Sequence, residues 1–309
     1  MPSSVIGEHL DCPPGATTEF LLPAIHEIIS RLREGHSRIY IPEREPQKAT
    51  GEMGHFHPYT ELFLQISGIE IFQCGSQRFA ACPGDITVIR PWIWHHERGW
   101  ADGAQPFRML VFMPTTTRTT ILCCHAKSDT GHIVTQQPAI QLPSSAGQTA
   151  FAHSLSTITS LAQYAPGDHH AAIREIIIAA LLNMAADLAQ QAQKSNQVAG
   201  KVVQAEALII TMLHRSDLSL ATIAEQLGCS SAYLSHLFAC EKGMSMTDFI
   251  HRKRIKLAEA MLKESCLNIS EVARGCGFRS SAYFSRLFRK LKGTTPRAFR
   301  QQFLGQQWA

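Results

Sequence analysis

Two histidines and a carboxylate stand at short, regular spacing between His55 and Glu61. Alternate residues of a β-strand share one face, so His55, His57 and Glu61 would point the same way, with Tyr59 among them. A further histidine, His95, follows a Pro-Gly turn and a β-rich run. We expect these imidazole, carboxyl and phenol groups to converge inside a β-barrel and to line a pocket.

The same stretch resembles the cupin pattern, which reads His-x-His-x3-Glu-x6-Gly followed by Pro-Gly and a later histidine. Gly68 and Pro83-Gly84 stand at the matching places, whereas the glycine that opens the motif in cupins is missing. In metal-binding cupins the four residues coordinate Fe, Mn, Zn or Ni, a role suited to nitrogen and oxygen ligands. The resemblance assigns this role to His55, His57, Glu61 and His95. We favour a metal-free pocket lined by the same residues, with metal binding as the alternative.

Two tryptophans precede the late histidine. Trp92 and Trp94 alternate with Ile93 on a predicted strand that approaches His95. They would form either an aromatic wall for a sugar or another planar ligand, or ordinary core, and we favour core for Trp94. The expected effector pocket therefore consists of His55, His57, Tyr59, Glu61, Trp92 and His95.

The composition is that of an ordinary globular protein, with 309 residues, 45% hydrophobic and 17% charged. The sequence has no long apolar run and does not begin like a secretory signal, so we expect a cytoplasmic protein without membrane contact.

Nine cysteines without a Cys-x-x-Cys pair are expected to be reduced thiols. The adjacent Cys123 and Cys124 indicate ordinary thiols, with a redox sensor as the alternative.

The elements fall into three blocks. A short helix is expected over Leu22–Glu34, followed by strands that include 61–67, 69–74, 85–89 and 107–113. Two apolar helices follow residue 147, and the second is apolar on more than one face, which is compatible with a subunit interface; packing against its own domain is the alternative. The polar stretch Gln190–Gly200 reads as a linker. We therefore predict an effector domain over 1–145, a dimerisation segment and linker over 146–200, and an all-α domain over 201–309.

The last third of the chain contains one segment written twice. Leu220–Gly228 returns as Ile269–Gly277 after 49 residues, and Ser231–Phe238 returns as Ser281–Phe288 after 50. Each copy predicts a short helix, a glycine turn and a second helix capped by a serine, the arrangement of a helix-turn-helix. A long helix over Met246–Lys263 would hold the two copies about 34 Å apart, one turn of DNA.

Charge separates this third from the rest. Residues 201–309 hold 16 Lys and Arg against 8 Asp and Glu, whereas residues 1–200 hold 13 against 17. Such a basic domain on a mildly acidic body indicates a polyanionic partner for that domain alone. The exposed faces of the second helices carry small and hydrogen-bonding residues suited to base edges and phosphates. The candidate DNA-binding residues are Ser230, Ala232, Ser235, His236, Lys253, Arg279, Ser281, Ala282, Ser285 and Arg286.

Leu218–Gln302 resembles the AraC/XylS family of bacterial transcription regulators. The resemblance rests on Tyr233–Phe238, Arg254–Ala258, Ile269–Ala273, Tyr283–Phe288 and Thr295–Arg300, a dense match to the signature of the family. The family usually has Arg where this chain has His236, so the first copy would make less cationic contact, through an imidazole neutral at pH 7. Arg254, another signature position, is expected to make an internal contact.

The predicted fold is therefore α+β and multidomain, with a cupin-like barrel (a double-stranded β-helix), dimerisation helices and two helix-turn-helix motifs. The expected function is a non-enzymatic transcription regulator controlled by a small-molecule effector, for which a sugar is one candidate. The expected partners are double-stranded DNA, a second copy of the chain and, for an activator, RNA polymerase. A metal-dependent cupin enzyme fused to a DNA-binding domain is the alternative.

Overall fold

The computed structural model describes residues 18–43, 54–102, 106–115, 118–126, 133–135, 140–143, 145–164, 169–194, 200–265 and 267–304. The chain divides into two compact units. The first comprises Met1–Glu43, Tyr59–Arg90 and Glu97–Ala199, and the second comprises Arg44–Pro58, Pro91–His96 and Gly200–Ala309. We call them the N-terminal unit and the C-terminal unit.

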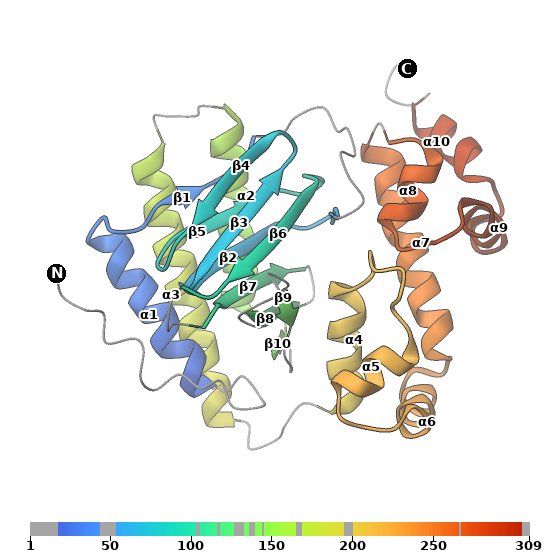
Figure 1. Ribbon diagram of the computed structural model, residues 1–309, viewed down its shortest axis with the longest axis horizontal. Helices are drawn as coiled ribbons and strands as arrows, with labels where there is room; N and C mark the ends of the chain where they lie inside the picture. Colours follow the sequence, from blue (N-terminus) through green and yellow to red (C-terminus); the bar gives the residue numbers. More distant parts are fainter. Residues whose placement is uncertain are drawn as a thin grey trace. The chain divides into compact units, whose positions relative to one another are not determined.

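The N-terminal unit is built on β-strands, as the β-rich composition predicts (Figure 1). The larger sheet has the order β1-β5-β2-β7-β8-β10, with β9 also paired to β8, and the smaller sheet has the order β4-β3-β6. The large sheet is antiparallel except where β1 pairs with β5. The strands are β1 Ile39–Tyr40, β2 Glu61–Ser67, β3 Ile69–Cys74, β4 Gln77–Ala81, β5 Ile86–Ile89, β6 His95–Trp100, β7 Arg108–Pro114, β8 Arg118–Ala126, β9 Ile133–Thr135 and β10 Ile140–Pro143.

Alternation along the strands gives the large sheet two buried faces. Leu62, Leu64 and Ile66 of β2 belong to a core shared with the helices. Phe63 alternates with them and meets Phe72 of the smaller sheet edge-on, with ring centroids 5.1 Å apart. The two sheets therefore pack face to face, and β2 is buried along its whole length because both of its faces are covered.

Three helices cover the other face of the large sheet (Figure 1). They are α1 Thr18–Arg33, α2 Ala146–Tyr164 and α3 His170–Lys194. Of the apolar residues of α3, Ile173, Ile177, Leu181, Met184 and Leu188 are buried inside the unit, while Leu182 is 41% exposed. Much of the apolar surface that suggests a subunit interface thus packs within the chain. The predicted linker is wrong at its start, because Gln, Ala and Lys are good helix formers and α3 continues to Lys194.

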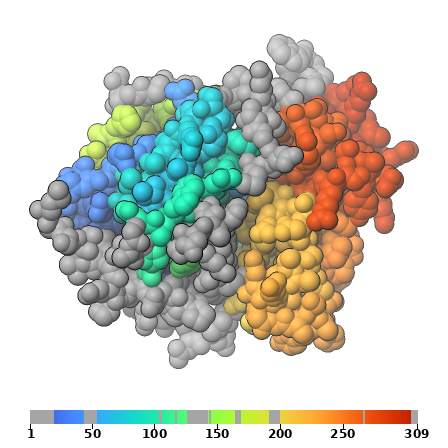
Figure 2. All heavy atoms as spheres, viewed as in Figure 1, coloured from blue at the N-terminus to red at the C-terminus, as the bar shows by residue number. Residues whose placement is uncertain are grey.

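The C-terminal unit contains the remaining helices described, and the atoms of their residues are coloured from yellow to red in Figure 2. Two apolar clusters hold them together, one around α4–α6 and the start of α7, the other around the rest of α7 with α8 and α9. The helices are α4 Lys201–Thr211, α5 Leu220–Gln226, α6 Ser231–Lys242, α7 Met246–Glu264, α8 Ile269–Gly275, α9 Ser281–Lys292 and α10 Pro296–Leu304.

Several sequence expectations are met and some are not. Helix α1 begins four residues before the predicted Leu22 and contains Pro23 as its sixth residue. His55–Glu61 is not one strand, because Pro58 interrupts it and β2 begins only at Glu61. Among the described residues no cysteine forms a disulfide, Cys123 and Cys124 included. Within the described residues, no helix combines the length and apolarity needed to cross a membrane.

Candidate nucleic-acid interface and candidate ligand site

The first helix pair of the C-terminal unit consists of α5 and α6. Ser219 caps α5 in a reciprocal capping box with Thr222, and Ser230 caps α6 by accepting a bond from the N–H of Tyr233. Gly228 makes the turn between them with φ of 59°. Ile223, Ala224, Leu234 and Phe238 are buried, so the pair is fixed by its own apolar cluster.

The second pair, α8 and α9, repeats this construction. Asn268 and Glu271 form the capping box of α8, and Ser280 caps α9. The turn residue Gly277 has φ of 78°, and a Cβ there would lie 2.3 Å from the Leu213 carbonyl oxygen, so only glycine fits. The predicted serine caps and glycine turns of both copies are confirmed.

Most candidate DNA-binding side chains face outward. Two are half-buried: Ser285, and Lys253, whose ammonium lies 5.0 Å from the Phe249 ring centroid. The remaining candidates are exposed at one end and one face of α6 and α9. They are Ser230, Ala232, Ser235, His236, Arg279, Ser281, Ala282 and Arg286.

Sequence reasoning missed two exposed aromatic residues. Tyr233 is 54% exposed and Tyr283 is 41% exposed, at equivalent positions of α6 and α9. The repetition of this tyrosine at an offset of 50 residues could have marked it as a functional position. A tyrosine among apolar residues, however, is usually interpreted as part of the core. Tyr283 lies against His251, with ring centroids 5.8 Å apart, while burial and the nearby Arg254 lower the pKa of His251.

A hollow of about 560 Å³ opens between the starts of α8 and α9. Its lining combines two guanidinium groups with polar side chains at two helix N-termini, a combination suited to phosphate oxygens. The lining residues are Asn268, Ile269, Ser270, Arg274, Arg279 and Ser281.

Helix α7 is the long element predicted between the copies. Its Arg254 is buried and donates bonds to the carbonyl oxygens of Leu213 at 3.1 Å and Arg215 at 2.6 Å. The expected internal contact is confirmed. The guanidinium ties the long helix to the turn between α4 and α5, and therefore fixes one helix pair relative to α7.

The histidines of the cupin-like pattern do come together. The ligand atoms of His55, His57, Glu61 and His95 all lie within 4.8 Å of one another. His55 and His95 pair through their backbones, in an isolated antiparallel bridge. Burial and the neighbouring imidazoles, with His214 and His95 foremost, hold the pKa of His55 well below its ordinary value.

The set fits a transition metal in its donor atoms. His95 Nδ1 lies 2.9 Å from the Ile93 carbonyl oxygen, so this nitrogen carries the proton and the Nε2 lone pair is left to bind. The Nε2 atoms of His57 and His95 are 3.3 Å apart, close to the separation of about 3.4 Å that tetrahedral Zn–N bonds require.

Two other expected pocket residues have different surroundings. Trp92 lies in a turn with φ of 67° rather than on a strand, and its Nε1 donates to Glu264 at 2.7 Å. It is buried with Phe56 and Trp94 in the apolar cluster of the C-terminal unit, as is expected for Trp94. Tyr59 is half-buried, and burial together with Glu61 raises the pKa of its phenol.

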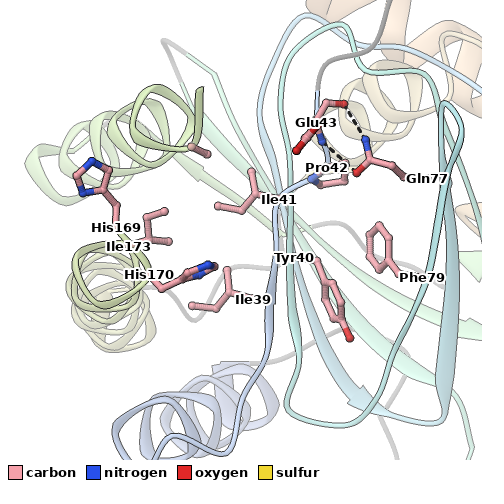
Figure 3. A pocket seen from close by; sticks show the side chains of 11 residues that line it. Ile39, Tyr40, Ile41, Pro42, Glu43, Gln77, Phe79, His169, His170 and Ile173 are labelled. Atoms are coloured by element: carbon pink, nitrogen blue, oxygen red, sulfur yellow. Dashed lines mark hydrogen bonds between the residues drawn. The ribbon is translucent and has the colours of Figure 1, made fainter. Parts of the chain in front are cut away.

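The N-terminal unit also has a pocket of about 370 Å³ that the sequence did not indicate (Figure 3). Its wall includes Tyr40 and Phe79, whose rings stack with centroids 4.6 Å apart. The Gln77 side chain closes one end by bonding the backbone of Glu43 in both directions. Figure 3 places His169 and His170 at the opposite side, where α3 begins.

Two family models match this chain. A helix-turn-helix domain matches residues 211–302, and an AraC-like ligand-binding domain matches residues 36–198. The chain is 26% identical over 240 residues to the arabinose operon regulatory protein of Salmonella typhimurium, covering 77% of this chain and 82% of that protein. It is 43% identical over 70 residues to the transcriptional activator RhaR of Cronobacter sakazakii, a match that covers 23% of this chain and 25% of RhaR.

A third relative is the HTH-type transcriptional regulator YijO of Escherichia coli, which is 31% identical over 131 residues. That match covers 42% of this chain and 46% of YijO, so the chain spans under half of that relative. Among solved structures, the C-terminal domain of AraT from Geobacillus stearothermophilus is 31% identical, with a TM-score of 0.33, covering 35% of this chain and 88% of that one. The DNA-binding domain of AdpA in complex with a target DNA is 24% identical, with a TM-score of 0.34. That match covers 35% of this chain and 96% of the AdpA domain.

Proposed function

Because the chain belongs to the AraC family of transcriptional regulators, we propose how its parts carry out regulation. The protein is a transcriptional regulator with an N-terminal ligand-binding domain and a C-terminal DNA-binding helix-turn-helix domain. Our proposal is that α5–α6 and α8–α9 are two such motifs, which place α6 and α9 in successive major grooves. The observation that carries it is the repeated construction, with matching caps, turns and exposed tyrosines.

The two motifs would read unlike sequences. Their buried positions agree, whereas the exposed His236 of α6 is replaced by Arg286 on α9. The last turn of α9 carries Arg289, Lys290 and Lys292, whereas that of α6 carries only Lys242. Lys292 pairs with Glu259 at 2.6 Å, much as Lys242 pairs with Glu206 at 2.7 Å, so the difference between the two helices lies in Arg289 and Lys290. We propose that α9 supplies most of the phosphate attraction. Selection of binding duplexes from a random-sequence pool tests DNA reading, and absence of any salt-sensitive, sequence-selective binding would refute it.

We propose that the effector binds the N-terminal domain and that this domain comprises residues 1–145. The candidate residues remain His55, His57, Tyr59, Glu61, Trp92 and His95, in a barrel of the cupin type. The arabinose operon regulator among the relatives makes a sugar one candidate. The pocket beside Tyr40 and Phe79 is a second candidate cavity. A ligand-induced rise in melting temperature, compared between Tyr40→Ala and His57→Ala variants, distinguishes the two.

We propose that His55, His57, Glu61 and His95 hold one divalent metal, with Zn²⁺ the best match to the nitrogen-rich set. Metal analysis of protein purified without chelator should find about one equivalent, and loss of two ligands in a His57→Ala/His95→Ala variant should abolish it. Wild-type protein without metal would refute the assignment. The alternative of a metal-dependent enzyme requires turnover as well as metal, and regulator relatives favour a non-enzyme.

The assembly is proposed to be a homodimer formed through residues 146–200. The solvent face of α3 presents Ala172, Ala179, Leu182 and Ala186 at helical spacing, a mildly apolar stripe. Sedimentation of the wild type and of Leu182→Glu tests this arrangement. A dimer in the cytoplasm would bind two asymmetric DNA sites and, if it activates, would contact RNA polymerase.

A further inference from the structure

The second helix pair contains an aromatic cluster that the first pair lacks. The ring of Tyr283 on α9 lies near those of Phe278 and His251, with centroids 6.2 and 5.8 Å away. Phe278 belongs to the turn between α8 and α9, and His251 belongs to α7. In the first pair Cys229 stands at the place of Phe278, and Tyr233 has no ring contact among the residues that the structure describes. The two tyrosines are therefore equivalent in position but not in surroundings.

His251 also reaches the phenol group itself. The Nε2 atom of its imidazole lies 3.5 Å from the Tyr283 hydroxyl oxygen, at the far end of an exposed side chain. The two residues are 32 positions apart and come from different helices, so helical spacing alone does not bring them together. The separation is at the long end of the hydrogen-bond range. We therefore assign the contact a directional role rather than a large contribution to stability.

The residues behind the imidazole are firmly held. Phe278 is buried, and its ring packs against that of Phe284 with centroids 5.2 Å apart. The guanidinium carbon of Arg254, which is anchored to two backbone carbonyls, lies 5.5 Å from the Phe278 ring centroid. The imidazole of His251 is nearly parallel to the Phe278 ring, at 19°. A fixed frame thus aims His251 at the phenol.

The surroundings of His251 also determine its charge. Burial, together with the positive charge of Arg254, lowers the pKa of His251 below 6.5, and Asp248 opposes this only in part. The imidazole is therefore neutral at pH 7, with one ring nitrogen that carries a proton and one that carries a free lone pair. A phenol has one proton to donate and an oxygen that accepts. When its proton is donated to the imidazole, only the accepting capacity of the oxygen remains.

We propose that His251 is a positioning residue for base reading, whose Nε2 accepts the phenolic proton so that the Tyr283 oxygen presents only lone pairs to DNA. This inference rests on the proposed DNA-reading function. In the major groove such an oxygen accepts from the amino groups of adenine and cytosine, whereas the keto oxygens of guanine and thymine are themselves acceptors. The second half-site therefore requires an amino group at one position.

The first helix pair has no such constraint. Within the described part of the chain, the hydroxyl of Tyr233 has no side-chain partner, so it donates as readily as it accepts. We expect Tyr233 to tolerate either an amino group or a keto oxygen at the equivalent position of the first half-site. The inference thus names one residue that makes the two motifs unlike in specificity.

Base preference of the full chain tests the proposal. The Kd is measured for a selected duplex and for its partner in which A·T is exchanged for G·C at the position that α9 reads. The wild type should prefer the selected duplex by about fivefold or more. His251→Leu should reduce this preference to less than about twofold, whereas His251→Gln should retain it, because its amide oxygen accepts the phenolic proton. An unchanged preference in His251→Leu, or an equal loss of affinity for both duplexes, would overturn the proposal.

A double-mutant cycle supplies the matched control. Tyr283→Phe removes the hydroxyl and should lose the same preference, and adding His251→Leu to it should have no further effect. Tyr233→Phe removes the equivalent hydroxyl of α6, and its effect should add to that of His251→Leu. Equal coupling of His251 to both tyrosines would show a general structural role and would overturn the proposal.

Histidine titration by NMR separates failure of this inference from failure of the proposed function. The ring signal of His251 is identified in the free full-length protein by its loss in His251→Gln. Tyr283→Ala uncovers the imidazole and should raise the pKa of His251 by about 0.5 or more, whereas Tyr233→Ala should leave it unchanged. Absence of any selected duplex would refute DNA reading. An unchanged pKa of His251 in Tyr283→Ala would overturn the positioning inference alone.

Discussion

Tyr233 and Tyr283 are the third residues of α6 and α9, and each backbone N–H is bonded at 3.2 Å to the hydroxyl of the capping serine. Both rings are exposed although they belong to helices with firmly buried opposite faces. The serine caps thus place two phenols at the N-terminal ends of two helices, the ends that meet base edges in helix-turn-helix proteins.

We predict that Tyr233→Ala and Tyr283→Ala each weaken binding to a selected duplex by about tenfold, since a stacked or hydrogen-bonded aromatic contributes about 1–1.5 kcal/mol. Fluorescence anisotropy measures the Kd, and thermal unfolding checks that the fold is intact. Phenylalanine at the same sites separates the ring from the hydroxyl. Unchanged Kd values in both alanine variants would remove the tyrosines from the interface.

The charge difference between the two helices predicts unequal salt dependence. Arg286→Ala should lower the slope of log K against log salt concentration by about one, because one phosphate contact is lost. His236→Arg should raise that slope by about one. Titrations between low and moderate salt measure both slopes. Equal slopes for wild type and Arg286→Ala would show that this guanidinium does not meet phosphate.

Arg254 should matter for stability rather than for DNA contact. Arg254→Ala removes the donor from the carbonyl oxygens of Leu213 and Arg215 and leaves a cavity where the guanidinium was. The free energy of unfolding should therefore fall by about 2–4 kcal/mol. Arg252, which is exposed two residues earlier, provides the control, and Arg252→Ala should change stability by less than about 0.5 kcal/mol. Urea unfolding of both variants checks this, and equal losses would contradict the account.

Glu70 predicts how stability depends on pH. Its side chain is fully buried, neither oxygen has a hydrogen-bond partner among the described residues, and burial followed by Glu97 raises its pKa well above the ordinary value of 4.5. The folded state therefore holds a proton that the unfolded chain releases above pH 4.5. The contribution of the Glu70 carboxyl to the free energy of unfolding is therefore full below pH 4.5. It is lost as the pH rises from 4.5 to the pKa that this carboxyl has in the folded state.

Glu70→Gln removes that dependence. Between pH 5 and 8 the wild type should lose at least about 1 kcal/mol more of its unfolding free energy than the variant. Denaturant titrations at several pH values measure the difference. Parallel curves would show that the Glu70 carboxyl does not bind a proton more tightly in the folded state.

The sequence predicted the helix pairs well because each depends on local chemistry. Ser230 and Ser280 as caps, Gly228 and Gly277 as turns and Phe238 and Phe288 as core all follow from spacing within about twenty residues. The strands β2 and β3 also lie where their apolar runs predict them.

Contacts between distant segments were not predictable in this way. Trp92 and Glu264 are 172 residues apart, and nothing in either neighbourhood specifies the other. The same holds for His214, which stacks on His55 from another part of the chain. Pro58 and Trp92, whose φ is positive, interrupt the two strands that were predicted to carry the histidines. The histidines nevertheless converge, because the irregular backbone at these places brings them together.

One chain is proposed to read two unlike half-sites through α6 and α9. The direct measurement is the Kd of the full-length protein for its selected duplex and for two duplexes in which either half-site is duplicated. The account predicts an asymmetric selected site and a loss of about tenfold or more for each duplicated version. Equal affinity for all three, or selection of a symmetric site of about 10 base pairs bound by one chain, would contradict it.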